Sequence, residues 1–381
     1  MTNSLFKVCH MTSVHKRYDA RILKKECVTL ANNGYDVTLV VADNQKDETY
    51  MGVKIRSINF TPKNRIDRIL NSKKKMLAKA LEIDADIYHF HDPELIPVGT
   101  FLIEHGKKVI YDSHEDYGQN IKEKTWIPSI LRPLVAYIFD LYEKNNAKKF
   151  NAIITVTPHI VEKFKQYHSN VYMVTNYPIL QETTSNNRQK KKQVCFTGLI
   201  SPFWCHEDVI KAVSLLDDVK YVLAGQTNMD YLEKLRVLDV KERIEYLGYL
   251  DSNAVNELQQ SSLAGIAILN YGPVVSGNLG SLGNTKIFEY MSAGIPVICT
   301  DFVLWKEIIN KWQCGICVSP TDSNAIAGAI NYLLRNREIA KTMGKHGRNA
   351  VENEYNWETQ ANILIQVYQS IRNSVHEGGI L

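Results

Sequence analysis

Short apolar runs alternate with helical patterns along almost the whole chain. Each run has the length and composition of a buried strand, and segments with helical spacing separate most of the runs. In the first half of the chain the runs occupy residues 6–11, 37–41, 53–58, 86–90, 108–111, 152–156 and 171–174. A second series occupies residues 194–197, 221–224, 244–247, 265–269 and 296–299. Strands separated by helices predict an α/β protein whose parallel sheets carry helices on both faces.

A polar tract divides the two series of strands. Residues 183–193 consist only of Thr, Ser, Asn, Gln, Arg and Lys, a composition typical of a linker. We therefore expect a first domain at 1–182 and a second at 194–356. A C-terminal helix at 357–381 can pack back on the first domain. The 381 residues are enough for two cores of this kind.

Composition narrows the class of protein. The chain has 23% charged and 45% apolar residues, as ordinary globular proteins do. Its formal net charge of +4 is too small to indicate nucleic-acid binding. The seven cysteines form no regular disulfide framework, so we expect a reducing compartment. Cys314 and Cys317 form a lone C-x-x-C pair without further ligands, so we expect neither a metal site nor a redox site at these two residues. No apolar run is long enough to cross a membrane or resembles a leader, which predicts a cytoplasmic protein.

The strongest chemical signal lies between residues 277 and 298. Glycines there precede a helix that is expected to begin at Asn284 and to end at Gly294. Glycine lets backbone N–H groups approach a ligand, and a helix N-terminus attracts anions. Lys286 and Glu289 share one face of that helix, where an ammonium group suits a phosphate and a carboxylate suits ribose hydroxyls. An ordinary helix with an acidic first turn is the alternative that these residues leave open.

Polar loops follow the strands of the first domain, at the edge where open α/β sheets bind ligands. The loop after the first strand contains Ser13, His15 and Asp19, and Arg21 begins the helix behind it. These polar and basic side chains suit the phosphate or hydroxyl groups of an acceptor, with a solvated loop as the alternative. The loop has no G-x-G-x-x-G, which argues against a dinucleotide dehydrogenase.

Three histidines lie on or just after central strands. His89 and His91 alternate with aromatic residues and therefore share one strand face. Two histidines on one face are compatible with a metal, but no third ligand is evident, so we expect no metal and a structural role for one of them. His114 stands beside carboxylates and can bond a sugar hydroxyl or move a proton; a buried core histidine is the alternative. The one D-x-D, at residues 84–86, precedes a strand and is interpreted as a turn.

In this order, these residues resemble the retaining GT-B glycosyltransferases of the family 4 kind, over nearly the whole chain. The matching segments are residues 12–15, 19–22, 91–95, 111–115, 176–178, 286, 288–291 and 293–297. The resemblance is strongest to enzymes that build bacterial surface polysaccharides. It implies two Rossmann-like domains facing each other across a cleft, with the donor bound mainly by the second domain and the acceptor by the first.

The resemblance also implies roles for particular residues. Glu289 would bond the ribose hydroxyls of a nucleotide sugar, and Lys286 with nearby amides would hold its diphosphate. The other donor-side residues would be Gly198, Tyr249 in the loop that contacts the base, Ser281, Leu282, Gly283, Asn284 and Thr285. His114 corresponds to the histidine that faces the transferred sugar. The acceptor side would comprise Ser13, His15, Asp19, Arg21 and His91.

Two departures from the family pattern concern the leaving group. Ser281 stands where the family usually has a second glutamate, eight positions before Glu289. The Arg and Lys that usually follow the glycine equivalent to Gly198 are missing, and His206 is the one candidate cation in that loop. We therefore expect the phosphate charge to rest mainly on Lys286 and the helix dipole.

The function expected from these observations is glycosyl transfer. A hexosyl or N-acetylhexosaminyl group would move from a nucleoside diphosphate sugar to a lipid-linked saccharide. A UDP-sugar is favoured as the donor over a GDP-sugar. No carboxylate pair stands out as nucleophile and acid, which favours front-face attack with retention. A lysine and amides can stabilise the leaving group without a metal, so no cofactor is expected. There are two alternatives: a GT-B-shaped nucleotide-sugar epimerase and a non-catalytic partner subunit. Ser281 and the missing cations are the reason for considering a non-catalytic subunit.

Two segments indicate contact with a membrane surface. Residues 63–81 mix seven Lys and Arg residues with apolar side chains, and residues 126–139 are apolar and aromatic with one charge. A basic amphipathic helix and an apolar wedge suit docking on anionic lipid, so we expect attachment to the inner face of the cytoplasmic membrane. A solvated helix and a core helix are the alternative interpretations.

Overall fold

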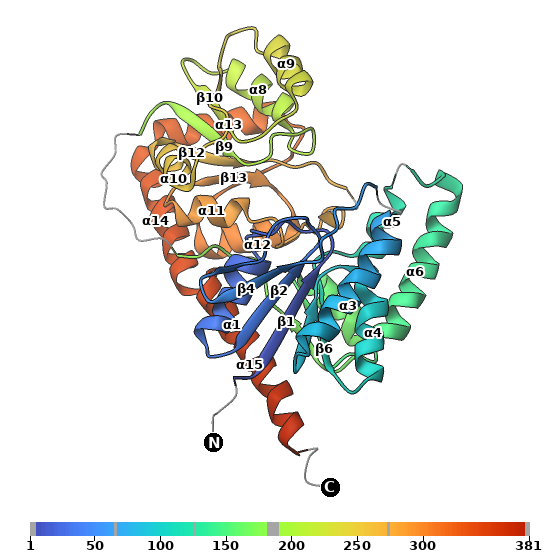
Figure 1. Ribbon diagram of the computed structural model, residues 1–381. Coiled ribbons are helices and arrows are strands. Elements are labelled where there is room, and N and C mark those ends of the chain that lie inside the picture. Colours follow the sequence, from blue (N-terminus) through green and yellow to red (C-terminus); the bar gives the residue numbers. More distant parts are fainter. Residues whose placement is uncertain (1–4, 65–66, 125, 181–189, 273–274, 378–381) are drawn as a thin grey trace. The chain divides into compact units, whose positions relative to one another are not determined.

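The chain forms two compact units (Figure 1). The computed structural model describes residues 5–64, 67–124, 126–180, 190–272 and 275–377, without the side chains of residues 69 and 374–377. The first unit combines Met1–Asn176 with Trp357–Leu381, and the second is Tyr177–Asn356.

The first unit is built on an eight-stranded sheet in the order β3-β4-β2-β1-β5-β6-β7-β8. Its strands are β1 (Lys7–Thr12), β2 (Asp36–Val41), β3 (Glu48–Tyr50), β4 (Val53–Ser57), β5 (Ile87–Phe90), β6 (Lys108–Ser113), β7 (Ala152–Thr155) and β8 (Val171–Met173). All neighbours pair in parallel except β3 and β4, which form a hairpin. The sequence pattern did not predict β3. Its three residues are too few for a periodic signal, and the positive φ angles of Met51 and Gly52 make the turn that pairs it.

Alternating side chains of this sheet enter two different cores. Cys9, Tyr88 and Tyr111 pack in one core, whereas Val8, Ile87 and Ile110 pack in the other. Because side chains alternate along a strand, the polar residues two positions after Val8, Ile87 and Ile110 lie on the same face as these three residues. The carboxyl ends of β1, β5 and β6 therefore bring His10, His89 and Asp112 to one face.

Helices cover both faces of the first sheet. They are η1 (Ile22–Cys27), α1 (Val28–Asn32), η2 (Arg68–Ser72), α3 (Lys73–Ile83), η3 (Pro93–Leu95), α4 (Ile96–Glu104), α5 (Tyr117–Lys122), η4 (Ser129–Leu131), α6 (Arg132–Ala147), α7 (Pro158–Lys165) and α15 (Trp357–Glu377). The segment η1 is a π-helix, in which the Glu26 N–H donates to the Arg21 carbonyl five residues back at 2.9 Å. Such turns often occur at functional sites, and this one carries Glu26 into the interior.

The second unit contains a six-stranded parallel sheet in the order β11-β10-β9-β12-β13-β14. Its strands are β9 (Gln193–Thr197), β10 (Lys220–Ala224), β11 (Ile244–Tyr246), β12 (Ala264–Ala267), β13 (Val297–Thr300) and β14 (Gly315–Val318). Its helices are α8 (His206–Ser214), α9 (Met229–Leu238), α10 (Ser252–Ser261), α11 (Lys286–Ser292), α12 (Val303–Trp312), α13 (Ser323–Arg335) and α14 (Arg337–Asn353). One mostly parallel and one parallel sheet, both flanked by helices, confirm the predicted α/β fold.

The last helix returns to the first unit. In α15, Gln360 Oε1 accepts a hydrogen bond from the Thr175 N–H at 2.8 Å, and Trp357 Nε1 donates to Thr29 Oγ1 at 2.9 Å. Tyr177, which the sequence pattern assigned to the first domain, belongs to the second unit, because its ring packs against Phe288 and Tyr355.

The predicted linker at 183–193 falls mostly outside the described residues, and its last residue, Gln193, begins β9. Within the described part of the chain, no helix combines the length and the apolar character needed to span a bilayer.

Candidate active site

The predicted donor-side pair lies at the start of α11 in the second unit. Lys286 and Glu289 are half-buried and form an ion pair, with Nζ 2.6 Å from Oε2. Thr285 donates from Oγ1 to the other carboxylate oxygen of Glu289 at 2.7 Å. The helix ends before Gly294, whose φ of +69° is the left-handed conformation of a helix stop. A phosphate that binds Lys286 would therefore compete with Glu289 for the ammonium group.

Gly198 lies directly against Lys286. A Cβ built on Gly198 would stand 2.7 Å from Lys286 Cε, and the φ of Gly198 is +143°. The Gly225 backbone packs against the Gly198 backbone, since a Cβ on Gly225 would stand 1.8 Å from the Gly198 carbonyl oxygen. Both positions require glycine, and the close approach of the two loops places the Gly198 backbone beside the Lys286 side chain.

Two pockets flank Tyr249 in this unit. One, of about 240 Å³, is lined by residues that include Gly198, Gly225 and Leu250. The other has a similar volume, and Glu289 is among its lining residues. Tyr249 lines both pockets and its side chain is 77% exposed. The structure thus brings together Gly198, Tyr249 and Glu289, which are widely separated in the sequence.

The loop before α11 is held by its own polar groups. Ser281 Oγ accepts from the Gly283 N–H at 3.1 Å, and the Ser281 carbonyl accepts from Trp305 Nε1 at 3.0 Å. Asn284 Oδ1 accepts from the Lys286 N–H at 3.4 Å, while the Leu282 side chain is buried in the core. These contacts shape the backbone, so that Ser281 and Asn284 support the loop conformation.

His206 cannot replace the missing cations. It is buried, and its Nδ1 lies 2.7 Å from the Tyr221 hydroxyl. Burial lowers the pKa of His206 to about 3, so the ring is neutral near pH 7. His206, the one candidate cation that the sequence offered in this loop, is therefore unsuited to that role, because the first turn of α8 packs its side chain into the core.

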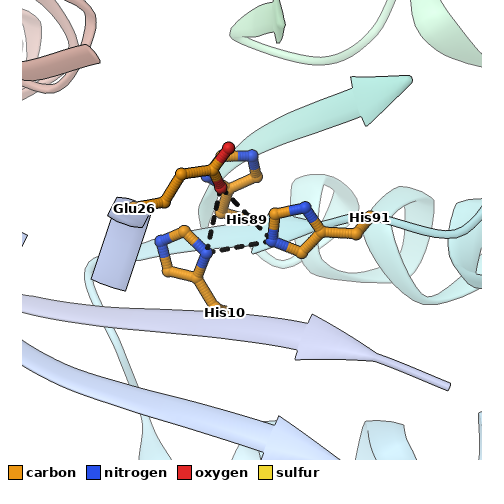
Figure 2. A group of neighbouring side chains, drawn as sticks. All are labelled: His10, Glu26, His89 and His91. Atoms are coloured by element: carbon orange, nitrogen blue, oxygen red, sulfur yellow. Dashed lines mark hydrogen bonds and ion pairs between the residues drawn. The ribbon is translucent and has the colours of Figure 1, made fainter. Parts of the chain in front are cut away.

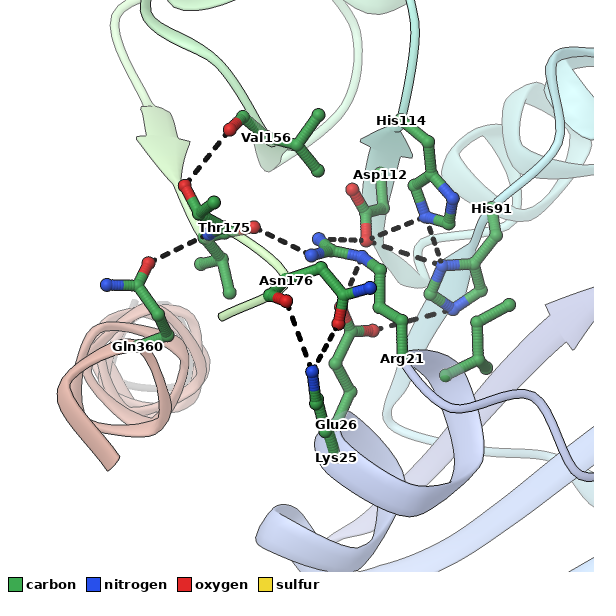
Figure 3. A network of polar contacts seen from close by, with 12 residues as sticks. Arg21, Lys25, Glu26, His91, Asp112, His114, Val156, Thr175, Asn176 and Gln360 are labelled. Carbon is green, nitrogen blue, oxygen red and sulfur yellow. Dashed lines mark hydrogen bonds and ion pairs between the residues drawn. The ribbon is translucent and has the colours of Figure 1, made fainter. Parts of the chain in front are cut away.

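The first unit gathers charged groups at the carboxyl ends of β1, β5 and β6 (Figure 3). Asp112 Oδ2 lies 2.9 Å from Arg21, 3.2 Å from His114 Nε2 and 3.4 Å from His91 Nδ1. Burial by itself would raise the pKa of Asp112, but Arg21 and His114 hold it well below its usual range. Asp112 is therefore an ionised anchor that orients both histidines, and of these three partners His114 is the most exposed.

Arg21 and Asp19, two predicted acceptor-side residues, are engaged within the fold. Arg21 is buried and contacts Glu26 Oε1 at 3.0 Å, in addition to Asp112. It also donates to the Val174 carbonyl at 2.7 Å. Asp19 Oδ1 accepts from the N–H groups of Arg21 and Ile22, at 2.8 and 2.9 Å. The structure gives both residues a positioning role.

Ser13 and His15 are organised by Asp92. The Ser13 N–H donates to Asp92 Oδ2 at 2.6 Å, and His15 Nδ1 lies 3.3 Å from Asp92 Oδ1. Burial lowers the pKa of His15, but the hydrogen bond and charge of Asp92 outweigh it, so the net pKa is raised. The His15 and His114 rings lie 5.1 Å apart and are both partly exposed. Among the histidines of this cluster, His15 and His114 are partly exposed, whereas His91 is fully buried.

Within the part of the chain that the structure describes, two groups of side chains have the composition and spacing of metal ligands. One comprises His10, Glu26, His89 and His91, and the other His91, Asp112 and His114. The expectation that His89 and His91 lack a third ligand is therefore wrong. The pairing of β1 with β5 brings His10 beside His89, and the buried Glu26 reaches them from η1. The sequence held one indication of this group: His10 lies two residues after the apolar Val8 on the first strand, so the two side chains share one face of that strand.

Comparison with known proteins identifies the family. Residues 20–176 match the model "Glycosyltransferase Family 4", and residues 181–350 match "Glycosyl transferases group 1". A phosphatidyl-myo-inositol mannosyltransferase of Mycobacterium leprae is 27% identical over 158 residues, which are 42% of this chain and 40% of that protein. The chain thus matches less than half the length of such curated relatives.

Solved structures share the fold over nearly the full chain. A sucrose-phosphate synthase from Thermosynechococcus elongatus has a TM-score of 0.76 at 14% identity, and the alignment covers 97% of this chain and 100% of that one. Anabaena HepE, solved in complex with UDP, has a TM-score of 0.68 at 14% identity, covering 96% and 100%. The family models and the fold together place this chain among the group 1 and family 4-like GT-B glycosyltransferases.

Proposed function

We propose that this chain transfers a sugar from a nucleoside diphosphate donor, UDP-sugar in preference to GDP-sugar, to a lipid-linked saccharide acceptor. The observation that carries the proposal is the convergence of Gly198, Tyr249, Lys286 and Glu289 around adjoining pockets of the second unit. The UDP complex of a protein with the same fold supports a uridine nucleotide as the ligand.

Each residue of this group suits one part of the donor. The exposed Tyr249 ring offers a surface for the base, and the Glu289 carboxylate can accept hydrogen bonds from ribose hydroxyls. Lys286 and the amides of the loop before it suit the diphosphate. Donor binding would then exchange the Lys286–Glu289 ion pair for contacts of each side chain with the ligand.

Glycosyl transfer leaves negative charge on the departing nucleoside diphosphate. Lys286 is placed to stabilise that charge, and the neutral His206 contributes none. In the first unit, Asp112 orients His114, which is the proposed contact to the transferred sugar. We assign the reaction to front-face attack with retention, in which His114 and His15 bond hydroxyl groups near the reacting carbon.

A lipid-linked acceptor is supported by the surface of the first unit. Residues 126–139 and the rest of α6 expose Trp126, Ile130, Leu131, Leu134, Tyr137, Ile138, Leu141 and Tyr142, a set that we call the α6 face. The core-helix interpretation of this segment is wrong for most of its apolar residues, because solvent reaches them. On α3, Lys74 and Lys75 are exposed while Met76 and Ala80 are buried. Apolar side chains together with lysines suit an anionic membrane surface.

Calorimetry and product analysis test this proposal. We expect the full chain to bind UDP, and GDP more weakly, and to transfer sugar from a UDP-sugar to a lipid-diphosphate saccharide with retained anomeric configuration. Proton NMR of the new anomeric centre reads out the configuration. An inverted product would refute the mechanism, absence of nucleotide binding would favour a non-catalytic subunit, and conversion of donor without acceptor would indicate an epimerase.

A further inference from the structure

The interior of the first unit contains a compact set of nitrogen and oxygen ligands (Figure 2). His10 comes from β1, Glu26 from η1, and His89 and His91 from β5 and the residue after it. All four side chains are fully buried. We propose that His10, His91 and Glu26 bind one divalent transition-metal ion, zinc by preference, with His89 beside them in the same group.

Three ligand atoms have the separation that a single zinc ion requires. His10 Nδ1 lies 3.0 Å from His91 Nε2, and Glu26 Oε2 lies 4.0 Å from the first and 3.8 Å from the second. A circle through the corners of such a triangle has a radius of about 2.1 Å, which matches zinc–nitrogen and zinc–oxygen bond lengths of about 2.0–2.2 Å. One ion can therefore reach all three atoms with little movement of the side chains.

The outer atoms of the ligands have partners that orient them. His91 Nδ1 lies 3.4 Å from Asp112 Oδ2, and His10 Nε2 lies 3.0 Å from the Tyr368 hydroxyl. If each outer nitrogen carries the proton, then the inner nitrogen of each ring presents a lone pair. Metal-binding histidines characteristically donate their other N–H to a carboxylate or another acceptor in this way. Glu26 follows the same arrangement, since Oε1 contacts Arg21 and Oε2 faces inward.

Without a cation, His10 Nδ1 and His91 Nε2 share a hydrogen bond with each other, whereas the groups around them are poorly satisfied. Among the described residues, neither carboxylate oxygen of Glu26 has a hydrogen-bond donor in good geometry, and His89 Nε2 also lacks a partner. Two buried carboxylates, Glu26 and Asp112, share the single guanidinium of Arg21. A cation beside Glu26 Oε2 would balance the remaining negative charge and satisfy the inward lone pairs.

The proposed ion has a structural role that is separate from donor binding. It would join β1, η1 and β5, and through Tyr368 it would also fix α15. His91 in turn lies 3.2 Å from His114 Nε2, so the ion would hold the ring that backs the accessible histidine. None of the ligands belongs to the second unit, so the failure of this proposal and the failure of nucleotide binding are distinguishable.

Metal analysis of the full chain without an affinity tag tests the proposal. We expect about one equivalent of zinc after purification from zinc-supplemented medium, measured by mass spectrometry of the elements. After removal of metal with a chelator, added zinc should raise the unfolding temperature, and added cobalt should give the visible absorption of a four- or five-coordinate site. Magnesium should do neither, because nitrogen ligands disfavour it.

Variants locate the ion. We expect Glu26→Gln and His10→Asn each to lower the zinc content at least tenfold, whereas His346→Gln, an exposed histidine on α14, should leave it unchanged. Should the ligand variants fail to fold, the measurements on the unaltered chain still decide. The proposal is overturned if that chain holds no zinc and shows neither the cobalt spectrum nor the thermal shift, or if both ligand variants retain a full equivalent.

Discussion

Lys286 and Glu289 illustrate how a single ion pair can prepare a ligand site. Each group neutralises the other at 2.6 Å, and both are partly shielded from solvent. The arrangement keeps the ammonium close to the Gly198 backbone, where a diphosphate is proposed to bind. A ligand that carries both phosphate and hydroxyl groups can replace both halves of the pair at once, which favours nucleotides over free phosphate.

We predict that Lys286→Ala and Glu289→Ala each weaken UDP binding by more than tenfold, or about 1.4 kcal/mol. The first variant removes the charge opposite the diphosphate, and the second removes the acceptor for ribose hydroxyls. Isothermal titration calorimetry measures both. Lys345→Ala, at an exposed position of α14, is the matched control and should bind as the unaltered chain does. Unchanged affinity in both site variants would show that the nucleotide binds elsewhere.

His206 predicts how the stability of the second unit depends on pH. Its folded pKa of about 3 lies below the unfolded value of about 6.5, so the unfolded chain binds the proton more readily. Stability is complete above the unfolded pKa and falls as the pH drops below it. Between pH 7.5 and 5.5 the loss from this residue should be about 1.4 kcal/mol.

Urea unfolding of the unaltered chain and of His206→Gln at the two pH values measures this contribution. The variant keeps a polar side chain near the Tyr221 hydroxyl but does not titrate, so its stability should change less with pH. His346→Gln should retain the pH dependence of the unaltered chain. Equal slopes for His206→Gln and the unaltered chain would mean that His206 is already accessible to protons.

At the scale of elements, the α6 face shows how one helix can serve two environments. Ala136, Glu143 and Ala147 of α6 are buried against the first unit, and the apolar side chains of the opposite surface are exposed. Lys163 from α7 approaches Glu143 Oε2 at 3.1 Å and thereby satisfies the buried carboxylate. The helix is therefore anchored by small and paired residues, and its larger apolar side chains are exposed, as the proposed contact with a lipid surface requires.

We predict that the full chain floats with vesicles that contain anionic lipid and does not float with neutral vesicles. Replacing Ile130, Leu134 and Ile138 by Asp should abolish flotation without lowering the unfolding temperature, because all three side chains are exposed. Val240→Asp changes an equally exposed apolar residue of the second unit and should float normally. Equal recovery of the triple variant and the unaltered chain with anionic vesicles would rule out the α6 face as the membrane contact.

At the scale of the whole molecule, the chain crosses between its units twice. Residues 1–176 form most of the first unit, the chain then builds the second, and α15 returns to complete the first. Leu364, Val367, Tyr368 and Ile371 of α15 belong to the apolar core on one face of the first sheet. The folding of the first unit therefore requires residues that lie at the far end of the sequence.

We predict that deletion of residues 357–381 unfolds the first unit and leaves the second folded. Removing four buried side chains forfeits about 6 kcal/mol or more of burial, which is comparable with the total stability of a domain. Limited proteolysis should digest the first unit of the truncated chain and spare residues 190–350. Gln369→Ala, at an exposed position of α15, is the control and should leave the first unit folded. Survival of the first unit in the truncated chain would contradict the assignment of α15 to its core.

Local patterns of the sequence determined much of this protein. Strand and helix periodicities repeat every two or four residues, so the α/β alternation, the helix at Lys286 and the polar ends of the strands can be recognised from neighbouring positions. The family resemblance likewise rested on short motifs, and the two family models match 20–176 and 181–350. The short strand β3 gave no such signal, because pairing defines it, and helical spacing around η1 predicted a helix but not its π-helical form.

Only the tertiary structure decided which side chains meet and which lie inside. His10 and His91 are separated by 81 positions, and the register of β1 with β5 brings them to 3.0 Å. Arg21 and His206 are polar residues, yet both are buried, because burial depends on the elements that pack above a residue. Periodicity specifies the face of an element, whereas strand order and packing specify what that face contacts. That physical difference separates what could be predicted here from what had to be observed.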